Sequence, residues 1–263
     1  MNILLTNDDG IYAEGLWALY NRLAQKHTVT VVAPDRERSA VGHGITLLEP
    51  LRATRVEVNG GSSGYAVNGT PVDCVKMGMM EILAARPDIA ISGINLGANV
   101  GININYSGTV AAAKEAALYG VPAIAVSILG YKIVHYADAA VFTEMLTENV
   151  YKKGLPFGTI LNVNVPDEPL EEIKGVRVSR QGLTCLSENF EKRTDPRNRT
   201  YYWYGPFSQS SFNNPDSFNN PDIDEAALCQ NFISITPIQG DMTDYNIIEE
   251  IKEWGINKDG LRD

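Results

Sequence analysis

The amino-acid sequence predicts an α/β fold: a Rossmann-like, mostly parallel sheet with helices on both faces and an extended C-terminal excursion or hairpin arm. Short apolar, β-branched runs alternate with helical patterns through the first two thirds of the chain. These runs are apolar at nearly every residue, which is typical of strands buried on both faces of a parallel sheet. A polar stretch over 181–224 follows, and it predicts the excursion.

The elements of the first two thirds are expected in strand–helix order. Thr70, Pro71 and Asp73 predict a helix start, because they supply an N-cap, a first-turn proline and a capping-box acid. Residues 44–67 do not fit the alternation and predict extended pieces, such as a hairpin beside the sheet. The expected strands cover 3–6, 28–33, 89–92, 123–128 and 159–165, and the expected helices cover 14–25, 70–85, 109–118 and 136–152.

The chain changes character after Pro166. Residues 211–222 repeat the hexapeptide SFNNPD, and Asn-Asn-Pro-Asp is typical of turns. A strand at 232–236 and a helix at 243–254 are expected after it. We therefore divide the chain into a Rossmann-like core, 1–180, and a C-terminal part, 181–263, that holds the excursion, the returning strand and the last helix.

Composition and charge argue against several classes of partner. The 263 residues include 22 Lys+Arg and 32 Asp+Glu, for a net charge of -10, so neither nucleic acid nor a membrane is expected as a partner. Much of the acidity lies in 216–263. The odd number of cysteines (Cys74, Cys185, Cys229) argues against a disulfide framework and for a reducing compartment. With no signal peptide or membrane-length apolar run, we expect a cytoplasmic protein.

Asp8 and Asp9 directly follow the first expected strand. In open α/β sheets ligands bind beyond the carboxyl ends of the strands, where this loop lies. Two adjacent carboxylates repel each other there, and a divalent cation relieves the repulsion. Position alone leaves an alternative open, in which one of the two caps the next helix and the other faces water.

Further polar loops follow the other strands or open helices. Glycines 93, 97 and 101 surround Asn95, in a spacing that predicts close approach of the backbone to a ligand or simply a tight connection. Ser107, Gly108 and Thr109 open an Ala-rich helix and predict a phosphate cradle or an ordinary N-cap.

Two more loops complete the group. The segment 34–44 offers Ser39, His43 and two arginines, and Asn68 precedes a helix start. The alternatives are a surface histidine, local ion pairs and a turn with a cap. Four or five of these loops are expected at one end of the sheet, and their oxygen and amide groups suit phosphate and Mg²⁺ or Mn²⁺ rather than zinc.

Six ordered motifs resemble those of the SurE family of survival-type nucleotidases: TNDDG, PDRERSAVGHGIT, NGTPVDCV, SGINLGANVG, YSGTVAAA and SITP. The resemblance is dense over 1–130 and resumes at Asp224 and 234–237. It implies a metal-dependent acid phosphatase for nucleoside monophosphates that uses one divalent cation, Mg²⁺ or Mn²⁺. It also implies a homodimer or homotetramer built partly through the C-terminal part.

The resemblance also assigns roles to residues. Asp8 and Asp9 are expected to be catalytic, one of them accepting a proton from a metal-activated water. The implied metal ligands are Asp8, Asp9, Ser39 and Asn95. The residues implied at the substrate or its phosphate are Asn95, Ser107, Gly108, Thr109, His43 and Asn68.

Two rival functions are weighed against direct hydrolysis. A covalent aspartyl-phosphate enzyme of the haloacid-dehalogenase type needs D-x-D, whereas this chain has Asn7, Asp8 and Asp9 in sequence. A nucleotide-binding or receiver-like regulatory module would hold Mg²⁺ without turnover, but a receiver needs an aspartate after a later strand, where Gly93 and Asn95 stand. We therefore predict a nucleotidase that works through metal-activated water.

Overall fold

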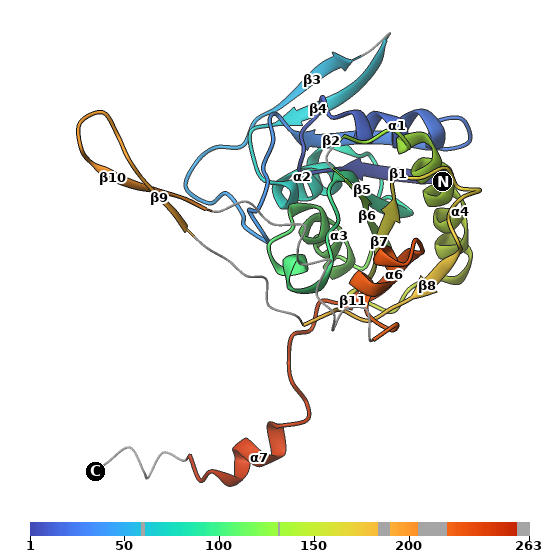
Figure 1. The fold of residues 1–263 in the computed structure, drawn as a ribbon. Helices are drawn as coiled ribbons and strands as arrows, with labels where there is room; N and C mark the ends of the chain where they lie inside the picture. Colours follow the sequence, from blue (N-terminus) through green and yellow to red (C-terminus); the bar gives the residue numbers. More distant parts are fainter. Residues whose placement is uncertain (59–60, 131, 184–189, 205–219, 257–263) are drawn as a thin grey trace.

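The protein forms a twisted sheet with helices on both faces, so the predicted α/β fold is confirmed (Figure 1). The structure is a computed structural model that describes residues 1–58, 61–130, 132–183, 190–204 and 220–256. Within these residues the main sheet has the strand order β3-β4-β2-β1-β5-β6-β7-β11-β8.

The centre of the sheet is parallel, as predicted. Its parallel strands are β1 (Asn2–Thr6), β2 (Thr28–Pro34), β5 (Ile89–Leu96), β6 (Ala123–Leu129) and β7 (Thr159–Pro166). The predicted hairpin is also confirmed, because β3 (Ala53–Val58) and β4 (Ser62–Val67) pair antiparallel and β4 joins the sheet through β2.

Two strands complete the other edge of the sheet, one from the C-terminal part and one from the end of the predicted core. β11 (Ile233–Gln239) runs antiparallel to β7, and β8 (Val176–Val178) pairs with β11 in parallel. α6 (Asp224–Cys229), a short helix that the sequence pattern does not predict, packs against β11 and β7. Both C-terminal elements therefore lie against the predicted core.

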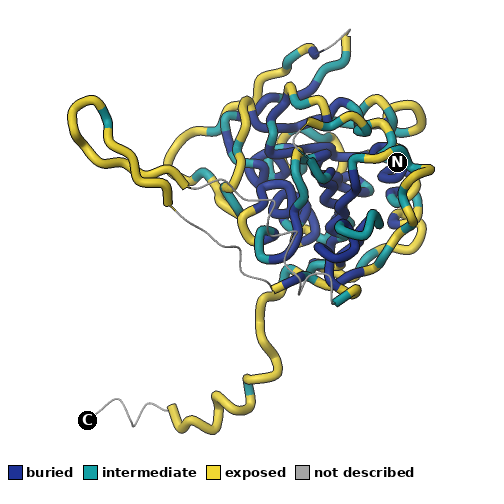
Figure 2. The backbone as a smooth tube through the Cα atoms, viewed as in Figure 1, coloured by how far each residue is buried: buried dark blue, intermediate teal, exposed yellow. Residues whose placement is uncertain are grey.

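Two layers of helices cover the sheet. α1 (Glu14–Leu23) and α4 (Tyr136–Lys153) share one core with the side chains of Ile3 and Leu5. α2 (Pro71–Met77) and α3 (Gly108–Leu118) share a second core with Leu4, which points to the opposite face, as alternation along a strand requires. Figure 2 shows this buried centre in dark blue. No helix of the described residues is long and apolar enough to cross a membrane.

Two predicted helices are shorter than expected. The capping box of Thr70 and Asp73 is present, but α2 ends at Met77 and a π-helical turn over Gly78–Ile82 follows. The helix predicted over 243–254 is reduced to α7 (Ile248–Glu253), which buries none of its residues. Residues 243–247 are not helical, because Asp241 and Asp244 accept instead from the backbone N–H groups of Thr243 and Asn246, and such local bonds compete with a helix.

The predicted arm is a two-stranded hairpin of β9 (Phe190–Thr194) and β10 (Thr200–Tyr204). It projects from the body, as does the tail that carries α7 (Figure 1). Every residue of both strands is exposed. Of the doubled hexapeptide at 211–222, residues 211–219 lie outside the described residues, and so does Cys185.

Candidate active site

The loop after β1 presents Asp8 and Asp9 at the carboxyl end of the sheet. Asn7 holds the loop closed: its Nδ2 donates to the carbonyl of Gly10 at 3.0 Å, and its Oδ1 accepts from the Gly10 N–H at 3.2 Å. Gly10 adopts φ +99°, a conformation that L side chains rarely adopt. The sequence therefore builds a tight turn that fixes both carboxylates, and the loop position predicted from the sequence is confirmed.

Asp8 is buried against the first turn of α3. The hydroxyl of Thr109 donates to Asp8 Oδ1. Burial raises the pKa of Asp8, and the hydrogen bonds from Thr109 and from the backbone N–H of Gly108 counteract part of that rise. A Cβ at Gly108 would lie 2.8 Å from the Cβ of Asp8, so this close approach requires glycine. The N-terminus of α3 thus holds the carboxylate of Asp8.

Asp9 shares this environment but is less buried than Asp8. Burial and then the charge of Asp8 raise the pKa of Asp9 to about 7, while the Leu96 N–H donates to Asp9 Oδ2 at 3.1 Å. Among the described residues, neither Asp8 nor Asp9 takes part in an ion pair with a basic side chain. Two adjacent carboxylates held without a cationic partner are a fitting place for a cation.

A cavity of about 230 Å³ opens beside Asp8. It brings together Asp8, Ser39, Asn95 and Ser107, which were predicted from four separate loops. These polar side chains share the wall of the cavity with apolar ones such as Leu96 and Ala98. The complete lining consists of Asp8, Ser39, Ala40, Asn95, Leu96, Gly97, Ala98, Asn99, Asn103, Tyr106 and Ser107.

Ser39 and Asn95 add neutral oxygen atoms to the carboxylates. The backbone N–H of Arg38 donates to the Asp8 carbonyl at 2.8 Å, which attaches the Ser39 loop to the Asp8 loop. Ser39 Oγ donates to Glu37 at 2.6 Å. Asn95 Nδ2 donates to the Gly97 carbonyl at 2.7 Å, which leaves its Oδ1 to face a cation. The predicted donor set is therefore all oxygen, the chemistry that Mg²⁺ and Mn²⁺ prefer.

The predicted phosphate residues divide into two groups. Ser107 lines the cavity, and its Oγ also accepts from the Val110 N–H at 3.1 Å as the N-cap of α3. Gly108 and Thr109 face Asp8 instead and are absent from the cavity lining. The structure therefore places Gly108 and Thr109 behind Asp8.

His43 and Asn68 brace the loop that carries Ser39. His43 Nε2 lies 2.7 Å from Oε2 of Glu115, a buried residue of α3. The Asn68 carbonyl accepts at 3.0 Å from Nη2 of Arg38, the residue directly before Ser39. Neither residue is among those that line the cavity. Their contacts brace the loop of Ser39, and their assignment to the substrate stays a prediction.

Several lining residues were not singled out from the sequence. Asn99, from the glycine-rich segment 92–101, Tyr106, from the segment YSGTVAAA, and Asn103, which lies between these segments, line the cavity. The signal that finds Asn99 and Asn103 is their place beside Gly97 and Gly101, since a loop that approaches a ligand presents all its polar members there.

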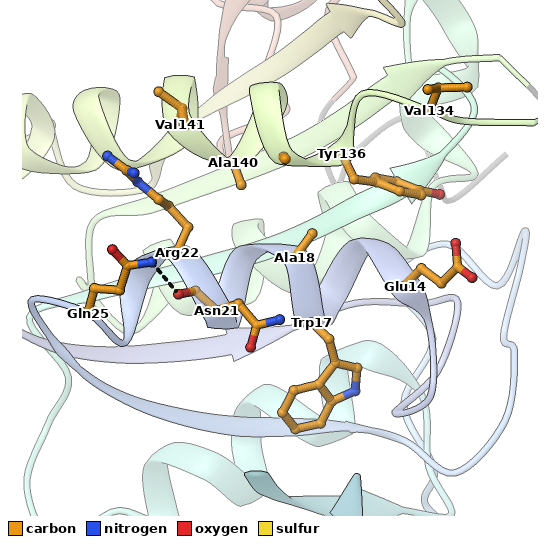
Figure 3. A pocket seen from close by; sticks show the side chains of 11 residues that line it. Glu14, Trp17, Ala18, Asn21, Arg22, Gln25, Val134, Tyr136, Ala140 and Val141 are labelled. Atoms are coloured by element: carbon orange, nitrogen blue, oxygen red, sulfur yellow. Dashed lines mark hydrogen bonds between the residues drawn. The ribbon is translucent and has the colours of Figure 1, made fainter. Parts of the chain in front are cut away.

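A larger cavity of about 610 Å³ lies elsewhere, between α1 and α4 (Figure 3). Trp17, Arg22 and Tyr136 line it together with small apolar side chains. Nearby, His27, Glu144 and Glu148 are close enough to share an ion. However, Arg22 and Lys26 already pair with Glu144 at 2.5 and 3.3 Å, so this cluster does not favour a metal. The cavity beside Asp8 remains the candidate active site.

Comparisons with known proteins agree with this geometry. The family model described as "Survival protein SurE" matches residues 3–188. A 5'-nucleotidase SurE of Desulfatibacillum aliphaticivorans is 54% identical, over 98% of this chain and 100% of its own length. A 5'-nucleotidase SurE of Syntrophobacter fumaroxidans is 47% identical, over 97% and 100%. The crystal structure of the SurE protein from Aquifex aeolicus has a TM-score of 0.80 at 36% identity and covers 97% of this chain and 99% of that chain. The chain thus belongs to the SurE family.

Proposed function

We propose that the protein is a metal-dependent 5'-nucleotidase that hydrolyses nucleoside monophosphates to nucleoside and phosphate. The observation that carries the proposal is the convergence of Asp8, Ser39, Asn95 and Ser107 on one cavity, with Asp9 beside it. The names of the family relatives, 5'-nucleotidase SurE, support the substrate class.

The proposed roles follow from the contacts. Asp8, Asp9, Ser39 and Asn95 would hold one Mg²⁺ or Mn²⁺. When bound, that cation polarises the phosphoryl group and lowers the pKa of a bound water. One of the two aspartates accepts the proton of the attacking water.

The remaining predicted residues act around this group. Ser107 meets the phosphate from the N-terminus of α3, where backbone amides and the helix dipole favour negative charge. Gly108 and Thr109 would lie at the phosphate together with Ser107, and they also hold Asp8. His43 and Asn68 would lie near the substrate, and their contacts with Glu115 and Arg38 brace the loop of Ser39.

The test is phosphate release from a nucleoside monophosphate with Mg²⁺ or Mn²⁺, in the presence and absence of EDTA. We expect hydrolysis that EDTA stops, and we expect Asp8→Asn and Asp9→Asn each to reduce it by at least about a hundredfold. The matched control is Asp88→Asn, since Asp88 lies just before β5, at the opposite end of the sheet.

Two other outcomes would contradict this proposal. Unchanged EDTA-sensitive hydrolysis in both aspartate variants would refute the assigned site. Binding of the nucleotide and metal without any phosphate release would favour the second candidate, a nucleotide-binding or receiver-like regulatory module, over the enzyme.

We also propose that the part 181–263 serves oligomer contacts, in a homodimer or homotetramer. The hairpin and the tail both expose large apolar side chains, a pattern that marks interaction surfaces. Those of the hairpin are Phe190, Tyr201, Tyr202, Trp203 and Tyr204, and those of the tail are Met242, Tyr245, Ile247, Ile251, Trp254 and Ile256. We further propose a cytoplasmic location, which the odd cysteine count supports.

Light scattering coupled to size-exclusion chromatography tests the assembly. The wild-type protein should elute as a dimer or tetramer, and Trp203→Ser or Trp254→Ser should shift it towards a smaller species. Phe157→Ser is the control, since Phe157 is also an exposed aromatic residue but lies outside the part 181–263. A monomeric wild-type protein would refute the assembly proposal.

A further inference from the structure

One wall of the cavity beside Asp8 is an irregular turn over 97–101. Gly97, Ala98 and Asn99 line the cavity directly. Gly97 and Gly101 adopt φ +98° and +58°, and the turn connects the end of β5 at Leu96 to a short 3-10 helix that begins at Gly101. The position of such a turn is set by the hydrogen bonds that the rest of the molecule offers to its backbone.

The sheet supplies the first set of these bonds, all to Asn99. The Asn99 N–H donates to Asn164 Oδ1 at 2.8 Å, and its carbonyl accepts from Asn162 Nδ2 at 2.8 Å. Its own Nδ2 donates to Ser127 Oγ at 2.8 Å. The polar ends of β6 and β7 therefore fix the middle of the turn.

The C-terminal part supplies the second set, at Gly101. Asp224 Oδ2 accepts from the Gly101 N–H at 2.9 Å, and Gln181 Nε2 donates to the Gly101 carbonyl at 2.8 Å. Asp224 Oδ1 accepts from the Gly182 N–H at 3.0 Å. One carboxylate at the start of α6 thus joins the turn to residues 181–182.

Asp224 is an unusual residue to place there. It is fully buried, and among the described residues it has no ion pair with a lysine or arginine. Its charge is met by backbone N–H groups, including those of Gly101 and Gly182. Burying a carboxylate without a cationic partner lowers the stability of the fold. The role of Asp224 is therefore to be found in the positions of the backbone groups that it binds.

We propose that Asp224 is a positioning residue of the active site: by binding Gly101 it sets the distance of the 97–99 wall from Asp8. The C-terminal part thereby shapes the substrate cavity, although none of the residues that line the cavity belongs to it. This inference rests on the proposed nucleotidase function. It predicts an effect mainly on substrate binding, because the 97–99 wall lines the cavity whereas the Asp8 carboxylate is held independently by Thr109.

The test uses Asp224→Asn in the full-length protein. Asparagine keeps the shape but offers one acceptor oxygen in place of two, so either the Gly101 or the Gly182 bond is lost. We expect KM for a nucleoside monophosphate to rise about tenfold or more while kcat falls less than about threefold. Gln181→Ala removes the other bond to Gly101 and should raise KM in the same direction by a smaller factor.

Ser179→Ala is the matched control. Ser179 is also buried in the C-terminal half and loses a 2.6 Å bond to Ser234, yet neither residue touches the turn. It should leave KM within about twofold of wild type. Hydrogen–deuterium exchange should quicken over 97–101 in Asp224→Asn and stay unchanged in Ser179→Ala.

The outcomes separate this inference from the proposed function. If the wild-type protein releases no phosphate, the nucleotidase proposal is refuted. Hydrogen–deuterium exchange over 97–101 then still tests whether Asp224 fixes the turn. If the wild-type protein is active and Asp224→Asn leaves KM and exchange as in Ser179→Ala, the positioning role is refuted. A fall in kcat alone, with KM unchanged in both Asp224→Asn and Gln181→Ala, refutes it as well.

Discussion

Thr109 donates its hydroxyl to the buried carboxylate of Asp8, across a separation of 101 residues in the sequence. The contact joins the first turn of α3 to the loop after β1. It fixes which way the Asp8 carboxylate faces, because a carboxylate oxygen with a buried donor is not free to rotate. Any ligand held by Asp8 therefore depends on Thr109 as well.

Thr109→Val tests this dependence. Valine keeps the shape of the side chain but cannot donate, so it leaves Asp8 Oδ1 without its donor. A lost hydrogen bond to a charged group is worth about 1.5–3 kcal/mol, and we expect kcat/KM to fall about tenfold to a hundredfold. Thr109→Ser keeps the hydroxyl and should retain most of the activity. Equal activity of the valine and serine variants would contradict the role given to the hydroxyl.

Gly108→Ala should lower the activity although alanine favours the helix more than glycine does. Alanine is more favourable than glycine inside a helix by about 1 kcal/mol, so propensity alone predicts no loss of Tm. The added Cβ would lie 2.8 Å from the Asp8 Cβ and 2.9 Å from its Oδ2, which forces the carboxylate to move. We expect kcat/KM to fall at least about tenfold, because misplacement of a catalytic group by a fraction of an ångström is costly.

Ala111→Gly, on the same helix, is the control for which the opposite effects on stability and activity are expected. Ala111 lies one turn further on and is buried without being part of the cavity lining. This variant should lower Tm and keep kcat/KM. If Gly108→Ala keeps its activity, the close approach of Gly108 to Asp8 is not needed for function.

The sequence suffices to predict those features that depend on local pattern. Asp8, Ser39, Asn95 and Ser107 were predicted to converge because each follows a strand or opens a helix, and parallel strands bring such loops to one edge. The apolar runs likewise predict the central strands, since burial on both faces leaves a continuous signal.

Two of the features that the sequence misses depend on distant neighbours. The close contact of Gly108 and Thr109 with Asp8 was not predicted, because Thr109 and Asp8 lie 101 residues apart in the sequence. Asp224 was noted as part of the resemblance without a role, because its partner Gly101 lies 123 residues away. The predicted length of the helix over 243–254 was wrong for a local reason: Asp241 and Asp244 bind nearby backbone N–H groups and compete with the helix.

Glu115→Gln tests the link between α3 and the Ser39 loop. Glu115 is buried and accepts from His43 at 2.7 Å and from Lys76 at 2.6 Å. Burial raises its pKa, but these two partners outweigh burial and hold the pKa of Glu115 below its ordinary value. Glutamine loses the charge, so we expect the free energy of unfolding at pH 7 to fall by about 1–3 kcal/mol in urea titrations. Glu191→Gln is the control: Glu191 pairs with Arg193 on the exposed hairpin, where such pairs contribute little, so no change in the urea midpoint is expected.

The pH dependence of stability should carry the signature of Glu144, which joins α4 to α1. Burial raises the pKa of Glu144, but hydrogen bonds and charge from Arg22 and Lys26 outweigh burial and hold the pKa below its ordinary value of 4.5. A carboxyl group with a lowered folded-state pKa stabilises the fold above its unfolded-state pKa, and this stabilisation is lost as the pH falls through the folded-state pKa. The difference in unfolding free energy between the wild type and Glu144→Gln should therefore be constant from pH 7 to about pH 5 and shrink at lower pH. Urea titrations at pH 7, 5, 4 and 3 measure it. A difference that grows on acidification would mean that the Glu144 carboxylate is not stabilised by Arg22 and Lys26, since only a raised folded-state pKa gives that sign.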